Sequence, residues 1–292
     1  MNAPARTEFR AALVQMCTGR NIAQNIADAS DMIVDAVRDG AEFVSTPETT
    51  HFMELSGRRL FETIKPQDED PGVSQFAKLA DKLNIWLNIG SLAVKVQENK
   101  AANRSFLFSP RGEVHATYDK IHMFDVDLEG RESYRESKNY RAGDSAVLTR
   151  LPWGNLGMTI CYDLRFPHLY RKLAQLGANI ITVPSAFTEA TGKAHWHSLL
   201  RARAIETGCF ILAAAQGGLH ENGRQTYGHS VIIAPWGEIL AEGEKNPCIL
   251  SANIDITESC KMRMRIPSLS DAKFYGVAGE GGAVLGTLKA VS

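Results

Sequence analysis

The chain has 292 residues, of which 44% are hydrophobic and 22% charged, and its net charge is −1. This length is enough for one large α/β domain or two smaller ones, and a near-neutral chain without a basic block is unsuited to binding nucleic acid or an anionic membrane. No apolar run is long enough for a signal peptide or a membrane span, so we expect a cytoplasmic protein.

Strand-like and helix-like segments alternate over the whole chain. Strands are predicted at 9–16, 42–47, 85–94, 104–120 (two strands joined by a turn at Pro110), 154–161, 179–184, 209–216, 229–243 (a hairpin) and 248–256. Helices are predicted at 21–38, 73–83, 167–176 and 195–207, and where the C-terminal tail begins. No Ser/Pro-rich linker interrupts the alternation. We therefore expect an α/β fold, a single domain over residues 1–292 with mixed sheets inside and helices outside, ending in a tail from roughly residue 260 to 292.

Two further patterns bear on the organisation of this domain. The sequence "GAEFVSTPE" at 40–48 parallels "GANIITVPS" at 177–185, which indicates repeated strand–helix units rather than a solenoid. The segment 125–145 is polar and has no regular period, so it is predicted to be a long loop. A loop of that length in a compact domain is usually functional or disordered.

One of the five cysteines stands out by its position. Five is an odd number and no C-x-x-C pair is present, so reduced thiols are expected rather than structural disulfides. Cys161 directly follows the apolar run 156–160 and precedes the polar residues Tyr162, Asp163 and Arg165. A thiol at the end of a strand is rigidly mounted and next to a loop, where reactive groups usually lie. The other cysteines are expected to be buried or incidental: Cys17, Cys209, Cys248 and Cys260.

Two more strand ends carry groups that could serve a cysteine nucleophile. Glu48 follows the predicted strand 42–47, and Lys120 follows the last strand of segment 104–120. Each has an ordinary structural explanation on its own: a carboxylate at a helix start, a surface lysine, a thiol filling the core. Together they supply the base, the cation and the nucleophile that covalent acyl transfer needs.

Both charges have a function next to a thiol. A lysine about 4 Å from a thiolate attracts it by roughly 4 kcal/mol at an effective dielectric constant near 20, and a carboxylate repels it by a similar amount. The two effects nearly cancel, so one proton is expected to be shared across a coupled Cys–Glu–Lys set. Glu48 could then take the thiol proton and return it to a leaving amine.

These residues lie in segments that resemble the nitrilase (carbon–nitrogen hydrolase) superfamily. The similar segments are "STPE" at 45–48, "YDKIHMFDVD" at 118–127, "RESKNYRAGD" at 135–144, "CYDLRFP" at 161–167, "PSAFTEATGKAHWHSLLRARAIE" at 184–206, "AAAQ" at 213–216, "YGHS" at 227–230 and "PWGE" at 235–238. The resemblance covers nearly the whole chain. Three of the segments, "RARAIE", "AAAQ" and "YGHS", look most like the deaminated-glutathione amidase branch, close to the ω-amidases.

The resemblance implies a four-layer α-β-β-α sandwich with the active site at the strand ends. Carried over by position, Cys161 would be the nucleophile, Glu48 the general base and acid, and Lys120 an oxyanion donor together with the backbone N–H of Tyr162. Glu136 matches a second carboxylate that shapes the site, although Glu132 lies in an overlapping "RES" of its own. The resemblance implies no metal and no organic cofactor, a small-molecule amide substrate, and a homodimer or higher homo-oligomer.

The substrate class implied by this branch is an amide whose far end carries an α-keto carboxylate. Such a substrate needs a cation near the triad, and Arg165, four positions after Cys161, is our first candidate, with Lys193 and Arg201 behind it. A structural ion pair of Arg165 with Asp163 or Glu48 is the competing expectation. We expect deaminated glutathione to be hydrolysed, 2-oxoglutaramate more slowly and nitriles poorly, while a nitrilase or an N-carbamoyl amino acid amidohydrolase would use the same triad.

Two other classes of protein remain as alternatives. A thiol hydrolase of the Cys–His type would use His195, His197 or His229 as its base, and a non-catalytic binding protein on an amidase scaffold would carry an unreactive Cys161. The pair His195 and His197 could also suggest a metal, but residues two apart on a helix do not share a face. With no carboxylate–histidine cluster evident in the sequence, packing and surface functions are expected for them. Three tryptophans are expected in the core: Trp153, Trp196 and Trp236.

Overall fold

The computed structural model describes residues 6–128, 133–273, 276–278 and 284–287. Two six-stranded sheets dominate it. The first sheet has the strand order β16 (Cys248–Asp255), β1 (Glu8–Gln15), β2 (Phe43–Ser45), β3 (Trp86–Gln97), β4 (Lys100–Phe108), β5 (Val114–Asp119). The second has the order β15 (Ile239–Glu242), β14 (Val231–Ile233), β11 (Phe210–Ala213), β10 (Ile180–Thr182), β9 (Asn155–Met158), β8 (Val147–Arg150).

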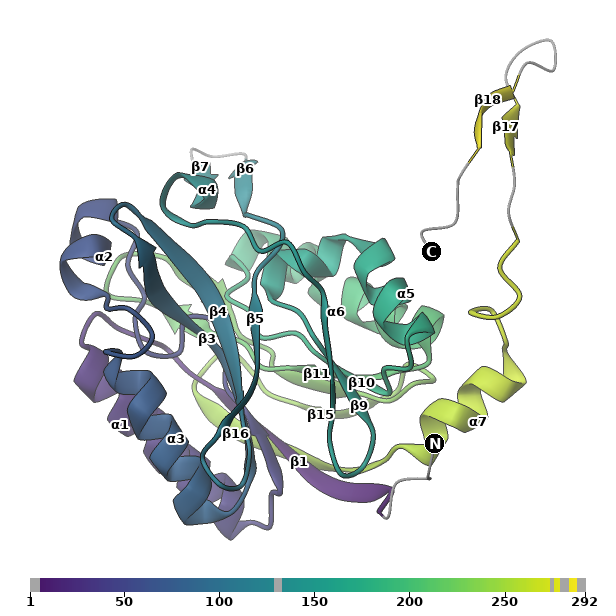
Figure 1. Cartoon of the computed structure of the whole chain (residues 1–292), viewed down its shortest axis with the longest axis horizontal. Helices are drawn as coiled ribbons and strands as arrows, with labels where there is room; N and C mark the ends of the chain where they lie inside the picture. The colour runs from purple at the N-terminus through teal and green to yellow at the C-terminus, as the bar shows by residue number, and fades with distance from the viewer. Residues whose placement is uncertain (1–5, 129–132, 274–275, 279–283, 288–292) are drawn as a thin grey trace.

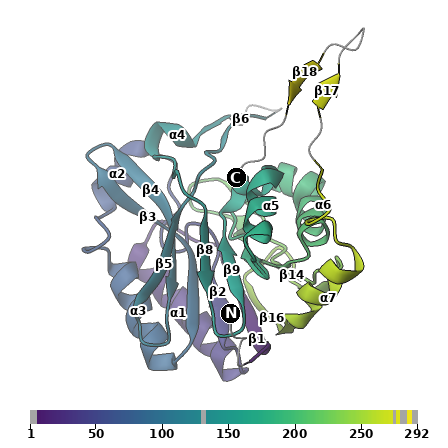
Figure 2. The same cartoon turned by 45° about the vertical axis from the view of Figure 1, so that its right-hand side comes forward.

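Helices cover the outer faces of both sheets (Figures 1 and 2). Helices α1 (Ile22–Arg38) and α3 (Pro71–Leu83) pack on the first sheet, and α5 (Pro167–Gln175) and α6 (Glu189–Thr207) pack on the second. The remaining helices are α2 (Gly57–Thr63), α4 (Glu136–Asn139), the short 3₁₀ helix η1 (Cys161–Arg165) and α7 (Thr257–Arg265). The prediction of a four-layer α-β-β-α sandwich is confirmed.

Burial along β1 shows why the layers stack in this order. Phe9 and Leu13 belong to the apolar cluster shared with the second sheet, whereas Ala12 and Val14 belong to the cluster under α1 and α3. Successive side chains of a strand point to opposite faces, so a strand buried on both faces is apolar almost throughout. The continuous apolar run of this segment therefore marks a sheet with a layer on each side.

The repeated sequence pattern corresponds to equivalent places in the two sheets. β2 lies between the parallel strands β1 and β3, and β10 lies between the parallel strands β9 and β11. Each of these three-strand groups is followed by two antiparallel strands and flanked by one more. The two sheets therefore place the carboxyl ends of their parallel strands at comparable positions.

Helix boundaries follow recognisable capping signals. The side chain of Asn21 accepts a hydrogen bond from the Gln24 N–H at the start of α1, and Asp70 accepts from Gly72 and Val73 at the start of α3. Both side chains satisfy N–H groups that the helix itself cannot pair. At the end of α1, Asp39 is the cap and Gly40 follows with a φ of +91°, the left-handed conformation that glycine adopts readily.

The polar segment 125–145 is not an irregular loop as predicted. It contains β6 (Asp125–Asp127) paired with β7 (Ser133–Arg135), followed by α4. The sequence missed them because each element has at most four residues, too few to show a period. The tail holds a further strand pair: after α7, β17 (Gly276–Ala278) pairs with β18 (Val284–Thr287), and both project away from the body in the two views (Figures 1 and 2).

A small additional sheet lies beside α6. It consists of β12 (Gly217–Leu219) and β13 (Gln225–Tyr227), which pair antiparallel. No helix among the described residues is long and apolar enough to cross a membrane. Of the three tryptophans expected in the core, Trp153 and Trp196 are buried, but Trp236 is 44% exposed at the turn of the β14–β15 hairpin, so that prediction was wrong for Trp236.

Candidate active site

The predicted triad meets at the carboxyl ends of strands from both sheets. Glu48 follows β2, Lys120 follows β5 and Cys161 follows β9. These side chains lie together in the wall of one cavity of about 220 Å³. The relative exposure of the three residues is only 4%, 2% and 6%, so their charges interact with little screening by water.

Lys120 is bonded to two carboxylates. Its Nζ lies 2.8 Å from Glu48 Oε1 and 2.8 Å from Glu136 Oε2. The ammonium is completely buried, which alone would lower its pKa, but the charges of Glu136 and Glu48 raise the pKa of Lys120 well above the usual lysine value. Lys120 therefore stays protonated at neutral pH.

Glu48 is held as a carboxylate by donors on several sides. Its Oε1 accepts from Lys120 and from Asn103 Nδ2 (2.9 Å), and its Oε2 accepts from the backbone N–H of Ala186 (2.9 Å). Burial favours the neutral acid, but the charge and hydrogen bond of Lys120 outweigh it, so the pKa of Glu48 lies below its ordinary value.

The thiol of Cys161 has the opposite preference. Burial, and then the negative charge of Glu48, raise the pKa of Cys161 above the ordinary thiol value, and the nearby Lys120 offsets this only in part. The resting site is therefore a neutral thiol beside an ionised Glu48 and a protonated Lys120. A carboxylate next to a thiol can accept its proton as the sulfur attacks.

The backbone at Cys161 is fixed in an uncommon conformation. Cys161 has a φ of +49°, in the left-handed region that non-glycine residues rarely adopt. Its N–H donates to the carbonyl of Pro184 (2.9 Å), and η1 begins here. The N–H of Tyr162 is in the first turn of η1, where a helix provides no acceptor for it. Tyr162 directly follows Cys161 in η1, so its N–H remains our candidate for the second oxyanion donor.

Asp163 anchors the turn that carries Cys161. This buried carboxylate accepts from the Tyr118 hydroxyl (2.7 Å), the Ile160 N–H (2.9 Å), and both the backbone N–H (3.0 Å) and Nδ1 (2.7 Å) of His122. Asp163 and its partners connect β5 and the segment after it to the end of β9. The carboxylate therefore does not pair with Arg165, one of the two ion pairs that the sequence allowed.

Glu136 occupies the position predicted for a second carboxylate. It begins α4, bonds Lys120 through both oxygens, and accepts from the Phe124 N–H (2.7 Å) and from Asn103 (3.0 Å). Asn103 thus bridges the two carboxylates, a contact that the sequence did not indicate because Asn103 lies inside β4 with no motif around it. Glu132, the alternative in the overlapping "RES", lies outside the described residues.

Three arginines line the cavity; Arg135 pairs with Asp127, whereas Arg165 and Arg224 pair with no carboxylate among the described residues. The guanidinium of Arg165 lies 5.3 Å from the ring centre of Phe187 and 5.8 Å from that of Tyr162, and its Nη1 is 3.3 Å from His195 Nδ1. Neither Asp163 nor Glu48 pairs with it among the described residues. The other cations that the sequence suggested lie elsewhere: Lys193 is exposed outside the cavity, and Arg201 bonds the carbonyl of Gly237.

Arg224 is a cavity residue that sequence reasoning missed. It lies between β12 and β13, donates to the Ala186 carbonyl, and stands 5.3 Å from the ring centre of Tyr134. Its Nε is buried with no hydrogen-bond partner, and it pairs with no carboxylate in the described part of the chain. Its loop sequence, "ENGRQ", shows no signal beyond a turn, so only the fold reveals where it points.

None of the described histidines lines the cavity. This argues against the cysteine–histidine alternative, since His195, His197 and His229 lie outside it. One prediction about these histidines was wrong: no carboxylate–histidine cluster was expected, yet His197 lies beside His229 and Glu242. The three come from segments far apart in the sequence, which is why spacing alone could not reveal them.

A buried thiol beside an ionised carboxylate and a buried ammonium, on a sandwich of two sheets, is the arrangement expected of a thiol-dependent acyl-transfer hydrolase. The family model for carbon–nitrogen hydrolases matches residues 10–263, and the chain belongs to this family. It is a hydrolase acting on carbon–nitrogen bonds other than peptide bonds. The alternative of a non-catalytic binding protein is thereby set aside.

Curated relatives point to one branch of the family. The chain is 39% identical over 268 residues to a deaminated glutathione amidase of Yersinia enterocolitica, which covers 90% of this chain and 92% of that protein. It is 38% identical over 270 residues to the protein of the same name from Synechocystis, covering 91% and 98%. The human deaminated glutathione amidase is 37% identical over 265 residues, covering 88% and 80%.

Solved structures agree with the fold. The NitFhit protein of C. elegans superposes with a TM-score of 0.86 at 34% identity over 92% of this chain, which spans 66% of that chain. Nit3 of Saccharomyces cerevisiae, a member of branch 10 of the nitrilase superfamily, superposes with a TM-score of 0.81 at 26% identity, covering 91% of this chain and 97% of that one.

Proposed function

We propose that this protein hydrolyses the amide bond of deaminated glutathione through a thioester on Cys161. The observation that carries the proposal is a buried thiol beside a paired carboxylate and ammonium. The same cavity holds Arg165 and Arg224, which pair with no carboxylate in the described part of the chain. The relatives named deaminated glutathione amidase support the choice of substrate.

In the first half-reaction, Cys161 attacks the amide carbon. Glu48, ionised in the resting site, accepts the thiol proton, and the carbonyl oxygen becomes an oxyanion. Lys120 and the N–H of Tyr162 stabilise that oxyanion; each such donor is typically worth a factor of about 10²–10³ in rate. When the C–N bond breaks, Glu48 returns the proton to the leaving amine, and an acyl thioester remains on Cys161.

The second half-reaction hydrolyses this thioester. Glu48 accepts a proton from water, the hydroxide attacks the thioester carbon, and the same two donors stabilise the second oxyanion. The C–S bond then breaks, the thiolate of Cys161 recovers the proton from Glu48, and 2-oxoglutarate leaves. Glu136 does not exchange protons in this scheme; together with Asn103 it fixes the position of Lys120.

The two arginines support a substrate with carboxylates. An arginine without a protein carboxylate partner can bind a substrate carboxylate through two parallel N–H bonds. Deaminated glutathione offers an α-keto carboxylate at one end and a glycine carboxylate at the other. We propose that Arg165 and Arg224 bind these groups, so that the amide lies over Cys161.

The test compares kcat/KM for three substrates in four proteins. Deaminated glutathione should be the best substrate of the wild type, 2-oxoglutaramate slower and a simple nitrile poor. Arg165→Leu and Arg224→Leu should each lower kcat/KM for the carboxylate substrates at least tenfold, mostly through KM. Arg58→Leu, which removes an exposed arginine paired with Glu62 on α2, is the matched control and should have no effect.

The runner-up functions are nitrile hydrolysis and the hydrolysis of N-carbamoyl amino acids. If either kind of substrate exceeds deaminated glutathione about tenfold in kcat/KM, equivalent to about 1.4 kcal/mol of transition-state preference, the branch assignment fails while the triad still stands.

We further propose that the protein functions as a homo-oligomer in the cytoplasm. Large apolar side chains are exposed on α7, on the β14–β15 hairpin and on the end of α6, and a second copy could cover them: Ile205, Trp236, Ile239, Leu240, Met264 and Ile266. The five unpaired thiols suit a reducing compartment. Sedimentation at micromolar concentration should give at least twice the monomer mass, and a monomer would contradict the proposal.

A further inference from the structure

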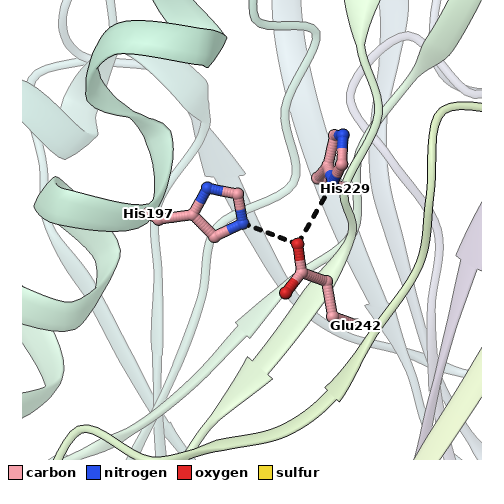
Figure 3. A group of neighbouring side chains, drawn as sticks. All are labelled: His197, His229 and Glu242. Atoms are coloured by element: carbon pink, nitrogen blue, oxygen red, sulfur yellow. Dashed lines mark hydrogen bonds and ion pairs between the residues drawn. The ribbon is translucent and has the colours of Figure 1, made fainter.

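Three possible metal ligands converge outside the active site. His197 projects from α6, His229 lies two residues before β14, and Glu242 ends β15 (Figure 3). His197 Nε2 lies 2.7 Å and His229 Nδ1 lies 3.1 Å from the same carboxylate oxygen, Glu242 Oε1. The side chains are 31%, 29% and 32% exposed, so solvent and small ions reach them.

This cluster lacks the cation that an ordinary surface carboxylate attracts. In the described part of the chain, neither a lysine nor an arginine pairs with Glu242; its side-chain partners are the two imidazoles. Both rings direct a nitrogen at one oxygen, as Figure 3 shows. Two imidazole nitrogens and one carboxylate oxygen are a ligand set typical of zinc sites with an open fourth position.

The distances suit a small ion with little rearrangement. All three candidate ligand atoms lie within 4.8 Å of one another. Zinc bonds to nitrogen and oxygen are about 2.0–2.2 Å long, which sets tetrahedral ligands about 3.3 Å apart. Rotations of the side chains that move the nitrogens and the oxygen by about an ångström would therefore complete the site.

The residues around His229 hold it in place. Its N–H donates to the Glu244 carbonyl (2.9 Å), its own carbonyl accepts from Trp196 Nε1 (2.8 Å), and its ring stacks on Tyr227 with ring centres 4.3 Å apart. Trp196 precedes His197 on α6 and is fully buried, so one indole fixes both histidine positions. Such supporting contacts orient ligand side chains in metal sites.

We propose that His197, His229 and Glu242 bind a divalent transition-metal ion, with Zn²⁺ the best match, through His197 Nε2, His229 Nδ1 and Glu242 Oε1. Water completes the coordination. Each coordinating ring nitrogen must be free of its proton to bind the ion, so any proton on it moves to the opposite ring nitrogen or to solvent. The ion links α6 to the β14–β15 hairpin and stabilises their packing.

The proposed metal site is separate from the catalytic cavity, since none of its three residues lines that cavity. Its variants should therefore keep the activity of the metal-free enzyme. The alternative to a metal site is a hydrogen-bonded His–Glu–His cluster that binds no ion. A direct measurement of metal binding distinguishes these two possibilities.

The test is calorimetric titration of chelator-treated, full-length protein with zinc chloride. Wild type should bind one ion at this site with a dissociation constant in the micromolar range or below. His197→Ala, His229→Asn and Glu242→Gln should each weaken that binding at least tenfold; asparagine is chosen because position 229 has a φ of +54°, a conformation that asparagine tolerates. Glu238→Gln, which changes an exposed carboxylate on the same hairpin, is the matched control and should bind as wild type does.

Two further measurements make the result decisive. Cys161→Ala should keep the site, and cobalt bound to it should absorb without a thiolate charge-transfer band. Zinc should raise the unfolding temperature of wild type but not of Glu242→Gln. Absence of zinc binding, equal affinity in all three ligand variants and wild type, or loss of binding in Cys161→Ala would each overturn the proposal.

Discussion

At the scale of single residues, the candidate active site is defined by which groups hold protons. The pKa of Glu48 is lowered chiefly by Lys120 against the effect of burial, and the pKa of Cys161 is raised by burial and by Glu48. The sequence suggested one proton shared among Cys161, Glu48 and Lys120. The pKa shifts of Glu48 and Cys161 instead favour one resting protonation state. In that state the thiol holds its proton and Glu48 is ionised, so Glu48 can accept the proton in the proposed mechanism.

This resting state predicts an acid limb at low pH. Glu48 must be ionised, and its pKa is below the ordinary glutamate value of about 4.3, so kcat/KM should stay flat on acidification until below that value. The same carboxylate contributes folding stability that is present above its unfolded pKa and lost as the pH falls through its folded pKa. Activity and circular dichroism are followed together. An acid limb between pH 6 and 7 would point to a histidine base instead.

The nearly isosteric substitution Glu48→Gln separates ionisation of the thiol from proton transfer by the base. Glu48→Gln removes the charge that raises the pKa of Cys161 while Lys120 remains. The thiol should therefore ionise at lower pH and still react with iodoacetamide, whereas amide turnover should fall at least a hundredfold because the base is gone. The measurements are alkylation rate against pH and kcat; a higher thiol pKa in Glu48→Gln would contradict the electrostatic explanation.

Removing Lys120 should affect both activity and folding. Lys120→Ala loses an oxyanion donor, so kcat should fall roughly a hundredfold or more, and it leaves two buried carboxylates facing each other, which costs about 3–5 kcal/mol of stability. The double variant Lys120→Ala/Glu136→Gln, which removes one of the two charges, should recover part of the stability but none of the activity. Urea unfolding and kcat distinguish the two effects. Near-normal kcat in Lys120→Ala would count against its proposed function.

At the scale of elements, the site residues at strand ends could be predicted from the sequence, whereas those in loops could not. Glu48, Lys120 and Cys161 each follow an apolar strand, and their chemistry is complementary, so three residues far apart along the chain could be grouped from the sequence alone. Arg224 could not be found this way, because the loop between β12 and β13 has no period. Asn103 was equally hidden, since an asparagine inside a strand gives no sign of its partners.

The short helix η1 depends on Asp163. Its carboxylate accepts four hydrogen bonds, among them one from the N–H of Ile160, directly before the left-handed Cys161. Asp163→Asn replaces one acceptor oxygen by a donor and removes the charge, so the free energy of unfolding should fall by about 2 kcal/mol and kcat should fall with it. Denaturant unfolding and kinetics test this. Asp271→Asn, on the surface, is the control; if Asp163→Asn matches it, Asp163 does not anchor the turn.

At the scale of the whole molecule, the two sheets meet closely behind the active site. A Cβ added to Gly90 in β3 would lie 2.1 Å from the Thr46 carbonyl oxygen and 2.5 Å from Pro184 Cβ. Thr46 follows β2 of the first sheet and Pro184 follows β10 of the second. Both belong to the repeated segments noticed in the sequence, so the repeat marks the place where the two sheets approach.

Gly90→Ala should therefore separate segments that the active site needs together. The clash involves backbone and cannot be relieved by a flexible side chain, so we expect a loss of about 3 kcal/mol of stability, at the upper end for overpacking. Gly223→Ala is the matched control: it also changes a glycine, but nothing lies within 4 Å of the added atom, and its φ of +85° limits the cost to about 1–2 kcal/mol. Equal stability of the two variants in urea would contradict the close approach.

The central claim is that the acyl group passes through Cys161, and one mass-spectrometric measurement tests it most directly. Wild-type enzyme is mixed with deaminated glutathione, quenched in acid within the first turnover and digested. An oxoglutaryl group is expected on the peptide that contains Cys161, and Cys161→Ala, with its folding intact, should show neither the adduct nor turnover. An acyl group on a different residue, or undiminished turnover by Cys161→Ala, would contradict the account.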